Sequence, residues 1–189
     1  MAEQRRVHDP KILRAIAHPA RGRILDELHA NGPLRAADVA RLLDVPANQA
    51  SFHLRQLAKY GLIEPAPELA KDRRDRVWRT VPGGLRFHDD DLEDNPGARA
   101  AQEVFLDQKA AFAHELVERA FAPKEKSDSF YAVLSDALRL SKDEGEEFLA
   151  EIGDVVDAWA KKTRGTDPHR KTYAFMAVVQ PYPEVGKSS

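Results

Sequence analysis

The stretch that decides the fold is residues 44–63, DVPANQASFHLRQLAKYGLI. Pro46 suits the first turn of a helix, where its missing N–H costs nothing, and Gly61 stands where a helix C-terminus favours a left-handed residue. Three apolar residues recur at i, i+4 and i+7, which places them on one face: Ala50, Leu54 and Leu57. The stretch therefore predicts an amphipathic helix that buries this face.

The other side of the predicted helix is rich in polar groups. Its candidate DNA-binding side chains are Asn48, Gln49, Ser51, Phe52, His53, Arg55, Gln56 and Lys59. Amides, a hydroxyl, an imidazole and cations can hydrogen-bond base edges and phosphates in a major groove, and Phe52 can contact a thymine methyl group or cover a neighbouring hairpin. Taken alone, the helix is explained equally well as a surface helix with a solvated polar face.

The residues before this helix predict a compact run of short helices. Asp9 and Pro10 favour a helix start, and His18 before Pro19 favours a break between that first helix and a second one at 20–30. Leu34 is expected in a very short strand, and a third helix is expected at about 37–43. Because so short a turn joins this third helix to the helix of residues 44–63, the pair predicts a helix-turn-helix.

A basic β-hairpin is expected directly after the predicted recognition helix. Residues 62–64 and 76–81 favour its two strands, and the polar tip between them carries Lys71, Arg73 and Arg74. These cations could contact the minor groove or its phosphates, as the wing of a winged helix does. Asp72 and Asp75 partly offset them, so a solvated loop is the competing interpretation. Trp78 is expected to pack within the wing.

These motifs together resemble the ArsR-type winged-helix regulators over roughly residues 8–81. The similar segments are 18–25 (HPARGRIL), 38–43 (DVARLL), 51–57 (SFHLRQL) and 61–63 (GLI). The resemblance implies a dimeric bacterial transcription factor that binds an inverted repeat, usually as a repressor released by an effector. By position, it also implies DNA contacts from Asn48, Gln49, Ser51, His53 and Arg55.

Metal sensing, which some members of that family perform, is poorly supported here. The chain has no cysteine, which excludes thiolate ligands, disulfides and cysteine nucleophiles. Asp107, His114 and Glu118 are candidate ligands on a later helix, but a solvated helix surface explains them as well, and the family's paired Asp-x-His pattern is missing. We therefore predict no metal and no cofactor.

Composition and charge agree with a binding protein rather than an enzyme. Residues 1–81 hold 15 Lys and Arg against 10 Asp and Glu, whereas residues 82–189 hold 14 against 21. A basic first half and an acidic second half suggest a polyanion-binding module on a solvated partner region. The sequence shows no phosphate-binding glycine loop, no Ser-centred elbow and no His/carboxylate set at ligand spacing, so we expect no catalysis. It also shows no secretory signal and no membrane-spanning run, which favours a cytoplasmic protein.

The second half of the sequence predicts an acidic linker followed by helices. Residues 82–97 form the linker, and helices are expected at 98–121 and about 127–140, with another opened by the capping box at Ser141 and Glu144. A short buried strand is expected at 172–180. The first of these helices is predicted to pair across a two-fold axis through Val104, Phe105, Phe112 and Leu116.

The remainder of this half either enlarges the dimer interface, forms a small-molecule effector pocket, or does both. The aromatic side chains that would line such a pocket are Phe130, Tyr131, Phe148, Trp159, Tyr173 and Phe175. Plain core packing is the more common role of such residues.

The sequence thus predicts a mainly α protein with a small β-hairpin. A winged helix-turn-helix domain (1–81) and the linker (82–97) precede a helical dimerisation or effector region (98–189). The expected function is a homodimeric, sequence-specific regulator of transcription that binds double-stranded DNA. The alternative is a winged-helix interaction module that docks a protein partner through its acidic second half.

Overall fold

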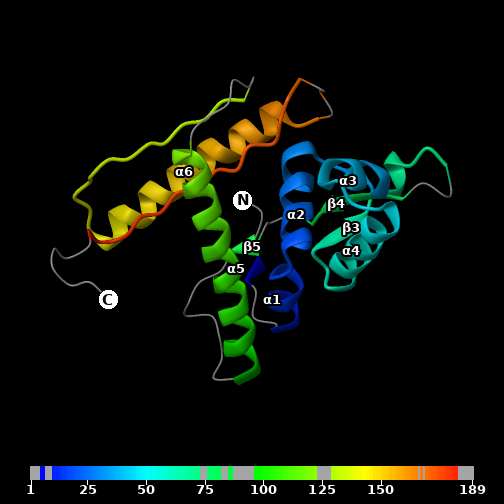
Figure 1. The fold of residues 1–189 in the computed structure, drawn as a ribbon, viewed down its shortest axis with the longest axis horizontal. Helices are drawn as coiled ribbons and strands as arrows, with labels where there is room; N and C mark the ends of the chain where they lie inside the picture. The colour runs from blue at the N-terminus through cyan, green and yellow to red at the C-terminus, as the bar shows by residue number, and fades with distance from the viewer. Residues whose placement is uncertain are drawn as a thin grey trace.

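The computed structural model describes residues 5–6, 10–72, 76–81, 85–86, 96–122, 129–165, 167 and 169–182. Helices dominate it, and the short strands form two small sheets (Figure 1). The elements in chain order are β1 (Arg5–Arg6), α1 (Pro10–Ile16), α2 (Pro19–Asn31), β2 (Leu34–Arg35), α3 (Ala36–Leu43), α4 (Ala47–Lys59), β3 (Ile63–Pro65), the 3-10 turn η1 (Pro67–Leu69), β4 (Val77–Thr80), β5 (Leu85–Arg86), α5 (Pro96–Phe121) and α6 (Lys142–Thr163).

The first four helices begin and end close to where the sequence predicts. His18, before Pro19, has extended backbone angles and separates α1 from α2. Asp44 ends α3 in the left-handed region, with φ 53°, and Gly61 follows α4 with φ 66°. These two left-handed residues turn the chain sharply on either side of α4, which fixes its angle to α3 and to the wing.

Three short strands close the winged domain. The sheet has the order β2-β4-β3, and both pairings are antiparallel. Trp78 of β4 lies opposite Leu34 of β2 and Pro65 of β3. Trp78 is 7% exposed and belongs to the core, so its predicted packing role is confirmed.

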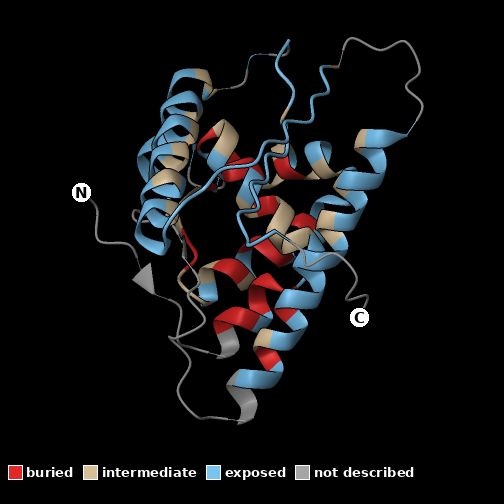
Figure 2. Cartoon of the chain, turned by 90° about the vertical axis from the view of Figure 1, so that its left-hand side faces the viewer, coloured by how far each residue is buried: buried red, intermediate tan, exposed pale blue. Residues whose placement is uncertain are grey.

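Helix α5 extends the core of the winged domain instead of standing apart from it. It packs along α1, and Ala101 and Phe105 are buried in the same cluster as residues of α1, α2 and α4. Figure 2 shows the buried residues gathered between these helices. Strand β5 lies within the stretch predicted as an acidic linker. It pairs in parallel with β1, which is near the start of the sequence. Neither this pairing nor the α1–α5 contact is apparent from the sequence.

Helix α6 begins at the predicted capping box. The Ser141 backbone N–H donates to Glu144 Oε2 at 2.7 Å, and the Glu144 N–H donates to Ser141 Oγ at 3.3 Å. None of its residues is buried (Figure 2), and Phe148, Ile152 and Val156 are half-buried.

Two sequence predictions about this half are wrong. Residues 129–140, predicted as a helix, and residues 172–180, predicted as a strand, have no regular secondary structure. Both run as extended chain beside α6 (Figure 1). The apolar pattern was interpreted as a helix and a buried strand, but in the single chain nearly every residue of both segments is exposed. Their place in the fold is taken up below.

Polar contacts join this second half to α2. Thr172 Oγ1 donates to Glu27 Oε2 at 2.7 Å, and Arg164 Nη2 donates to the carbonyl of His29 at 3.4 Å. His29 also lies 4.0 Å from Asp157 of α6. No helix in the described ranges has both the length and the apolar character needed to cross a bilayer.

Candidate nucleic-acid interface

Helix α4 is held by its inner face and exposed along the outer one. Ala50, Leu54 and Leu57 are each 0% exposed, as their spacing predicts. They pack against α2 and α3, and the turn at Asp44 places α3 directly before α4. Because its inner face is fixed in this way, the outer face of α4 is presented on a rigid element.

The outer face carries a continuous row of exposed side chains. The exposed members of the predicted set on α4 are Asn48, Gln49, Phe52, Arg55 and Lys59. Their spacing along the helix keeps them on one side. Ser51 and Gln56, also predicted as DNA-binding residues, are half-buried at the margins of this row. The row combines two amides and two cations, which can hydrogen-bond base edges and phosphates, with a ring that can contact a thymine methyl group.

Local hydrogen bonds orient two members of the row. Arg55 Nε donates to the carbonyl of Ser51 at 3.1 Å, which ties the guanidinium to the helix and leaves its terminal nitrogens out of this bond. The Asn48 side-chain oxygen accepts the Gln49 N–H at 2.9 Å, near the start of the helix. Phe52 is 49% exposed, and its ring lies 5.5 Å from that of His53.

His53 is not on the outer face, which corrects its placement among the DNA-reading residues. It is 4% exposed and points into the junction of α1 and α2. Its sequence position, next to Phe52 and Leu54, placed it on a flank of the helix. The packing of α2 against α4 encloses that flank. His53 lies three residues after the buried Ala50 and is therefore close to the buried stripe of the helix.

Two histidines and an arginine, His18, His53 and Arg21, lie together beside α4, and this group was not identified from the sequence; His53 is buried, whereas His18 is exposed. The His18 and His53 rings lie 4.7 Å apart, and Arg21 of α2 lowers the pKa of both through its charge. Burial is the larger cause of the lowered pKa in each histidine. Within the described part of the chain, both ring nitrogens of His53 and Nε of Arg21 are buried without a hydrogen-bond partner. The motif HPAR at 18–21 contains His18 and Arg21, but the sequence alone does not show that His53 lies beside them.

The wing is less basic on its described side than the sequence suggests. Arg79 of β4 donates to Glu64 Oε1 at 2.8 Å and also bonds Glu68, and both bonds raise its pKa. Lys71 is exposed near the tip, as predicted. Arg73 and Arg74, predicted to contact DNA, lie outside the described residues. Arg76, which directly follows them, is exposed.

The residues predicted to form the dimer contact divide into two groups. Val104 is 51% exposed, and Phe112 and Leu116 are half-buried, so all three are available on α5. Phe105 is only 6% exposed because it packs into the chain's own core, which corrects its assignment to a contact with another chain. Asp107, His114 and Glu118 are exposed on the same helix, and no metal-ligating cluster of three or more such residues occurs in the described ranges.

The aromatic residues proposed as pocket or core lie at the surface of the second half. Phe130 is 72%, Trp159 57% and Phe175 65% exposed. Tyr131 and Tyr173 are also exposed, and Phe148 is half-buried. They therefore form neither a core nor a closed pocket within one chain, which corrects the expectation that they pack inside.

The tri-helical arrangement of α2, α3 and α4 with a β-hairpin after α4 defines a winged helix-turn-helix domain, the DNA-binding class found in transcriptional regulators. Residues 16–66 match the family described as "Helix-turn-helix domain". The matched residues fall within 8–81, where the sequence resembles the ArsR-type winged-helix regulators. No curated protein sequence matches the chain.

Comparison with solved structures finds several transcriptional regulators at low identity. HlyU from Vibrio vulnificus is 20% identical, with a TM-score of 0.33, over 55% of this chain and 83% of that one. MepR from S. aureus, solved as a DNA complex, is 19% identical, with a TM-score of 0.35, over 75% and 78%. MarR from E. coli in its apo form is 13% identical, with a TM-score of 0.35, over 78% and 88%. Similarity this low carries no residue-level argument.

Proposed function

We propose that the protein is a cytoplasmic homodimer that represses transcription by binding an inverted repeat. The observation that carries this proposal is the exposed row on α4, formed by Asn48, Gln49, Phe52, Arg55 and Lys59. It projects from a helix whose opposite face is fully buried, so the row is held in place before any ligand binds.

Two further features support DNA as the ligand of this row. The first 81 residues carry five more cations than anions, which favours a polyanion over an acidic protein surface. The exposed face also mixes amides with cations, and this combination allows base edges to be read in addition to phosphate attraction. We infer that α4 enters the major groove and that Lys71, with Arg73 and Arg74, contacts the backbone beside it.

A two-fold axis would place two copies of α4 on half-sites about one helical turn, roughly 34 Å, apart. Val104, Phe112 and Leu116 of α5 are the side chains we assign to a contact between the two chains. The region 98–189 then acts as the dimerisation part, with residues 82–97 joining it to the DNA-binding part. An effector that binds this region would change the spacing of the two recognition helices.

The experiment that tests this function is selection of bound sequences from a random duplex pool. The intact chain is compared with a variant that combines Gln49→Ala and Arg55→Ala, and with Lys142→Ala as a matched control. Lys142 is an exposed cation on α6, far along the chain from the row. The proposal expects an enriched inverted repeat with the intact chain and with Lys142→Ala, and its loss with the double variant.

Absence of enrichment at low salt, where phosphate contacts are strongest, would overturn the proposal. The alternative is then a winged-helix module that docks a protein partner. Enrichment that survives the double variant would show that DNA is bound by a surface other than the row on α4.

A further inference from the structure

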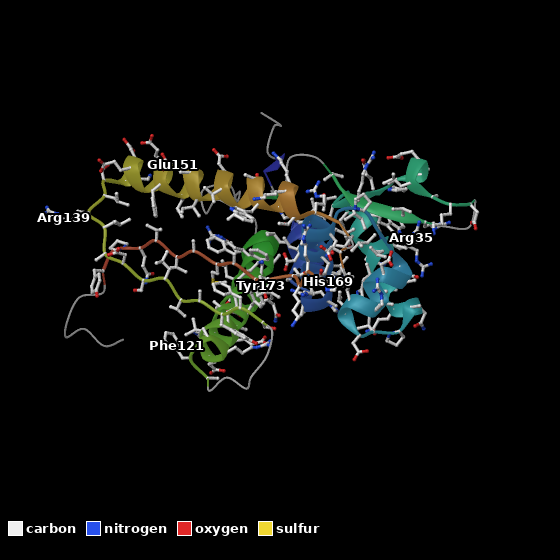
Figure 3. The ribbon with its side chains drawn as sticks, turned by 90° about the horizontal axis from the view of Figure 1, so that it is seen from above. Arg35, Phe121, Arg139, Glu151, His169 and Tyr173 are labelled. Carbon is white, nitrogen blue, oxygen red and sulfur yellow. The ribbon has the colours of Figure 1, made fainter. Side chains whose placement is uncertain are left out.

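In the second half of the chain, two extended segments lie along α6 and only partly cover it. Figures 1 and 3 show residues 129–140 and 170–182 both running along α6 toward the end where it begins. The chain thus makes one extended segment, returns through α6, and makes a second extended segment in the same direction as the first. This is the path of a β-α-β unit, in which a helix covers a sheet.

The face of α6 that would rest on such a sheet is only half covered. Half-buried residues recur along one face of it at intervals of three or four, as one face of a helix requires: Gly145, Phe148, Ile152, Val156, Ala160 and Thr163, with Gly153 half-buried beside them. None is buried, whereas α4 buries its equivalent face completely. The two extended segments are therefore too few to cover this face.

The two segments also lie too far apart to pair with each other. The backbone N–H of Phe130 donates to Tyr173 Oη at 3.1 Å, and Lys171 Nζ donates to Ser129 Oγ at 3.0 Å. Long side chains thus bridge the two backbones where paired strands would lie about 4.8 Å apart and share backbone bonds. Among the described residues, no backbone hydrogen bond joins 132–140 to 174–182, and neither segment belongs to a sheet.

Both segments have the composition of sheet strands and not of surface loops. In 129–140 the charged residues are Asp136 and Arg139, whose charges cancel, and Leu134 at its middle is 97% exposed. Segment 170–182 exposes Phe175, Val178 and Val179. Extended backbone with exposed apolar side chains is the template to which another strand adds, and after Arg170 and Lys171 the second segment carries no charged residue.

We propose that residues 129–140 of a second copy of this chain insert between the two segments, forming a four-stranded sheet shared by two chains. A second copy fits because each chain carries both the space for a strand and, in residues 132–140, an extended segment of suitable length that belongs to no sheet. The order is 170–182, then 129–140 of the other chain, then 129–140, then 170–182 of the other chain. Neighbouring strands in this order are all antiparallel, and one two-fold axis closes the assembly.

The anchoring of the two segments explains which one lies at the centre. Segment 170–182 is tied to its own winged domain, because Thr172 bonds the buried Glu27 of α2. Segment 129–140 is bonded at its start, where Ser129 and Phe130 contact Lys171 and Tyr173, whereas its middle, at Leu134, is exposed. The anchored segment therefore forms the edge, and the projecting one reaches the second chain.

This inference deepens the proposed function, since it specifies the interface of the proposed homodimer. It assigns the main contact to the second half of the chain, in addition to α5. Both copies of α6 would then lie on one face of the shared sheet and would bury the stripe that includes Phe148, Ile152 and Val156.

Disulfide formation between single introduced cysteines tests the strand arrangement, because the chain has none of its own. Cysteine is placed singly at each position from 131 to 138. In an antiparallel pair related by a two-fold axis, one position faces itself, so cross-linking peaks there and falls within two residues on either side. Glu151→Cys on the exposed side of α6 is the control and should give little cross-linked dimer.

Leu134→Asp provides a second, independent measurement. Leu134 is 97% exposed in the single chain, so the substitution leaves its fold intact, as far-ultraviolet circular dichroism checks. In the shared sheet it places a charge at the centre, and the dimer dissociation constant measured by sedimentation should rise at least tenfold. The same substitution at an exposed site outside the sheet, Leu69→Asp in η1, should leave that constant unchanged.

Cross-linking no greater than that of Glu151→Cys at every position, or a dissociation constant unchanged in Leu134→Asp, overturns the shared sheet. A monomer at all concentrations overturns it as well. These readouts need no DNA and are therefore independent of the selection experiment. If the chain forms the cross-linked dimer but enriches no DNA sequence, the shared sheet stands and the proposed function fails. If it enriches an inverted repeat but gives no cross-linked dimer, the proposed function stands and the shared sheet fails.

Discussion

The imidazole rings of His18 and His53 lie with their centroids 4.7 Å apart, tilted by 53°, beside the helix that carries the proposed DNA-reading row. Arg21, in the first turn of α2, places its positive charge near both rings. Two titratable rings beside a permanent cation can both stay uncharged at little cost, but neither can gain a proton without repulsion from the others.

Acid is therefore expected to weaken the winged domain. The lowered pKa of both histidines means that the unfolded chain, with an ordinary histidine pKa of about 6.5, binds more protons than the folded chain. Stability from this cluster is complete above that pH and is lost as the pH falls toward the folded-state values. Melting temperatures measured from pH 8 to pH 5 should show this loss.

The matched variant for the pH experiment combines His18→Gln and His53→Gln, which keeps polar side chains of similar size without the titration. Its melting temperature should depend less on pH over the same range than that of the intact chain. Equal pH dependence in the two proteins would show that other groups cause the loss of stability. His114→Gln, at an exposed site on α5, should behave as the intact chain does.

Replacement of Phe105 measures how far α5 belongs to the core of the winged domain. Phe105→Ala removes a ring that is 6% exposed, and the free energy of unfolding should fall by about 3–5 kcal/mol. Phe121→Ala on the same helix is the control, because that ring is 74% exposed and its loss should change stability by no more than about 0.5 kcal/mol. Urea denaturation of both variants gives the comparison, and equal effects would contradict the packing of α5 on α1.

The contact between Thr172 and Glu27 can be measured by a double-mutant cycle. Glu27 is 1% exposed and also contacts Arg23 and Asn31. Thr172→Val keeps the shape and removes one hydrogen bond to a carboxylate, so stability should fall by about 1–3 kcal/mol. In the background of Glu27→Gln the same change should cost less, since the acceptor is then uncharged. Full additivity of the two substitutions would show that the bond contributes nothing.

Within the proposed row, we expect Arg55 and Lys59 to contribute to DNA binding in different ways. Arg55→Ala should weaken binding to the selected site by about 1–3 kcal/mol and relax its specificity at one base position. Lys59→Ala should weaken binding to all duplexes alike and reduce the salt dependence by roughly one ion. Fluorescence anisotropy at several salt concentrations separates these effects. Identical profiles for the two variants would contradict the division into base-reading and phosphate-contacting residues.

The sequence predicts the winged domain closely because local signals determine it. Pro19, Asp44 and Gly61 fix turns through their own backbone preferences, and the apolar spacing of α4 sets its buried face. The burial of His53 and Phe105 is not local: each depends on an element far along the chain, α2 in one case and α1 in the other. Periodicity alone leaves such positions at the margin of a face.

The second half was harder to predict for a related reason. An apolar segment such as 129–140 fits a helix or a strand until its neighbours are known. In a single chain those neighbours are incomplete, so neither form is satisfied and the segment stays extended. The sequence alone gave the capping box at Ser141 correctly, because a cap needs only residues three apart.

The hydrogen bond from Thr172 to Glu27 spans 145 positions of the sequence. A ribosome releases α2 and the whole of α4 long before it adds Thr172. A product shortened near its end by proteolysis or premature termination thus keeps every side chain of the DNA-reading row, yet its Glu27 carboxylate lacks one of its donors. We therefore expect the N-terminal half of such a product to be less stable than that of the longer chain, and the product to be degraded more readily.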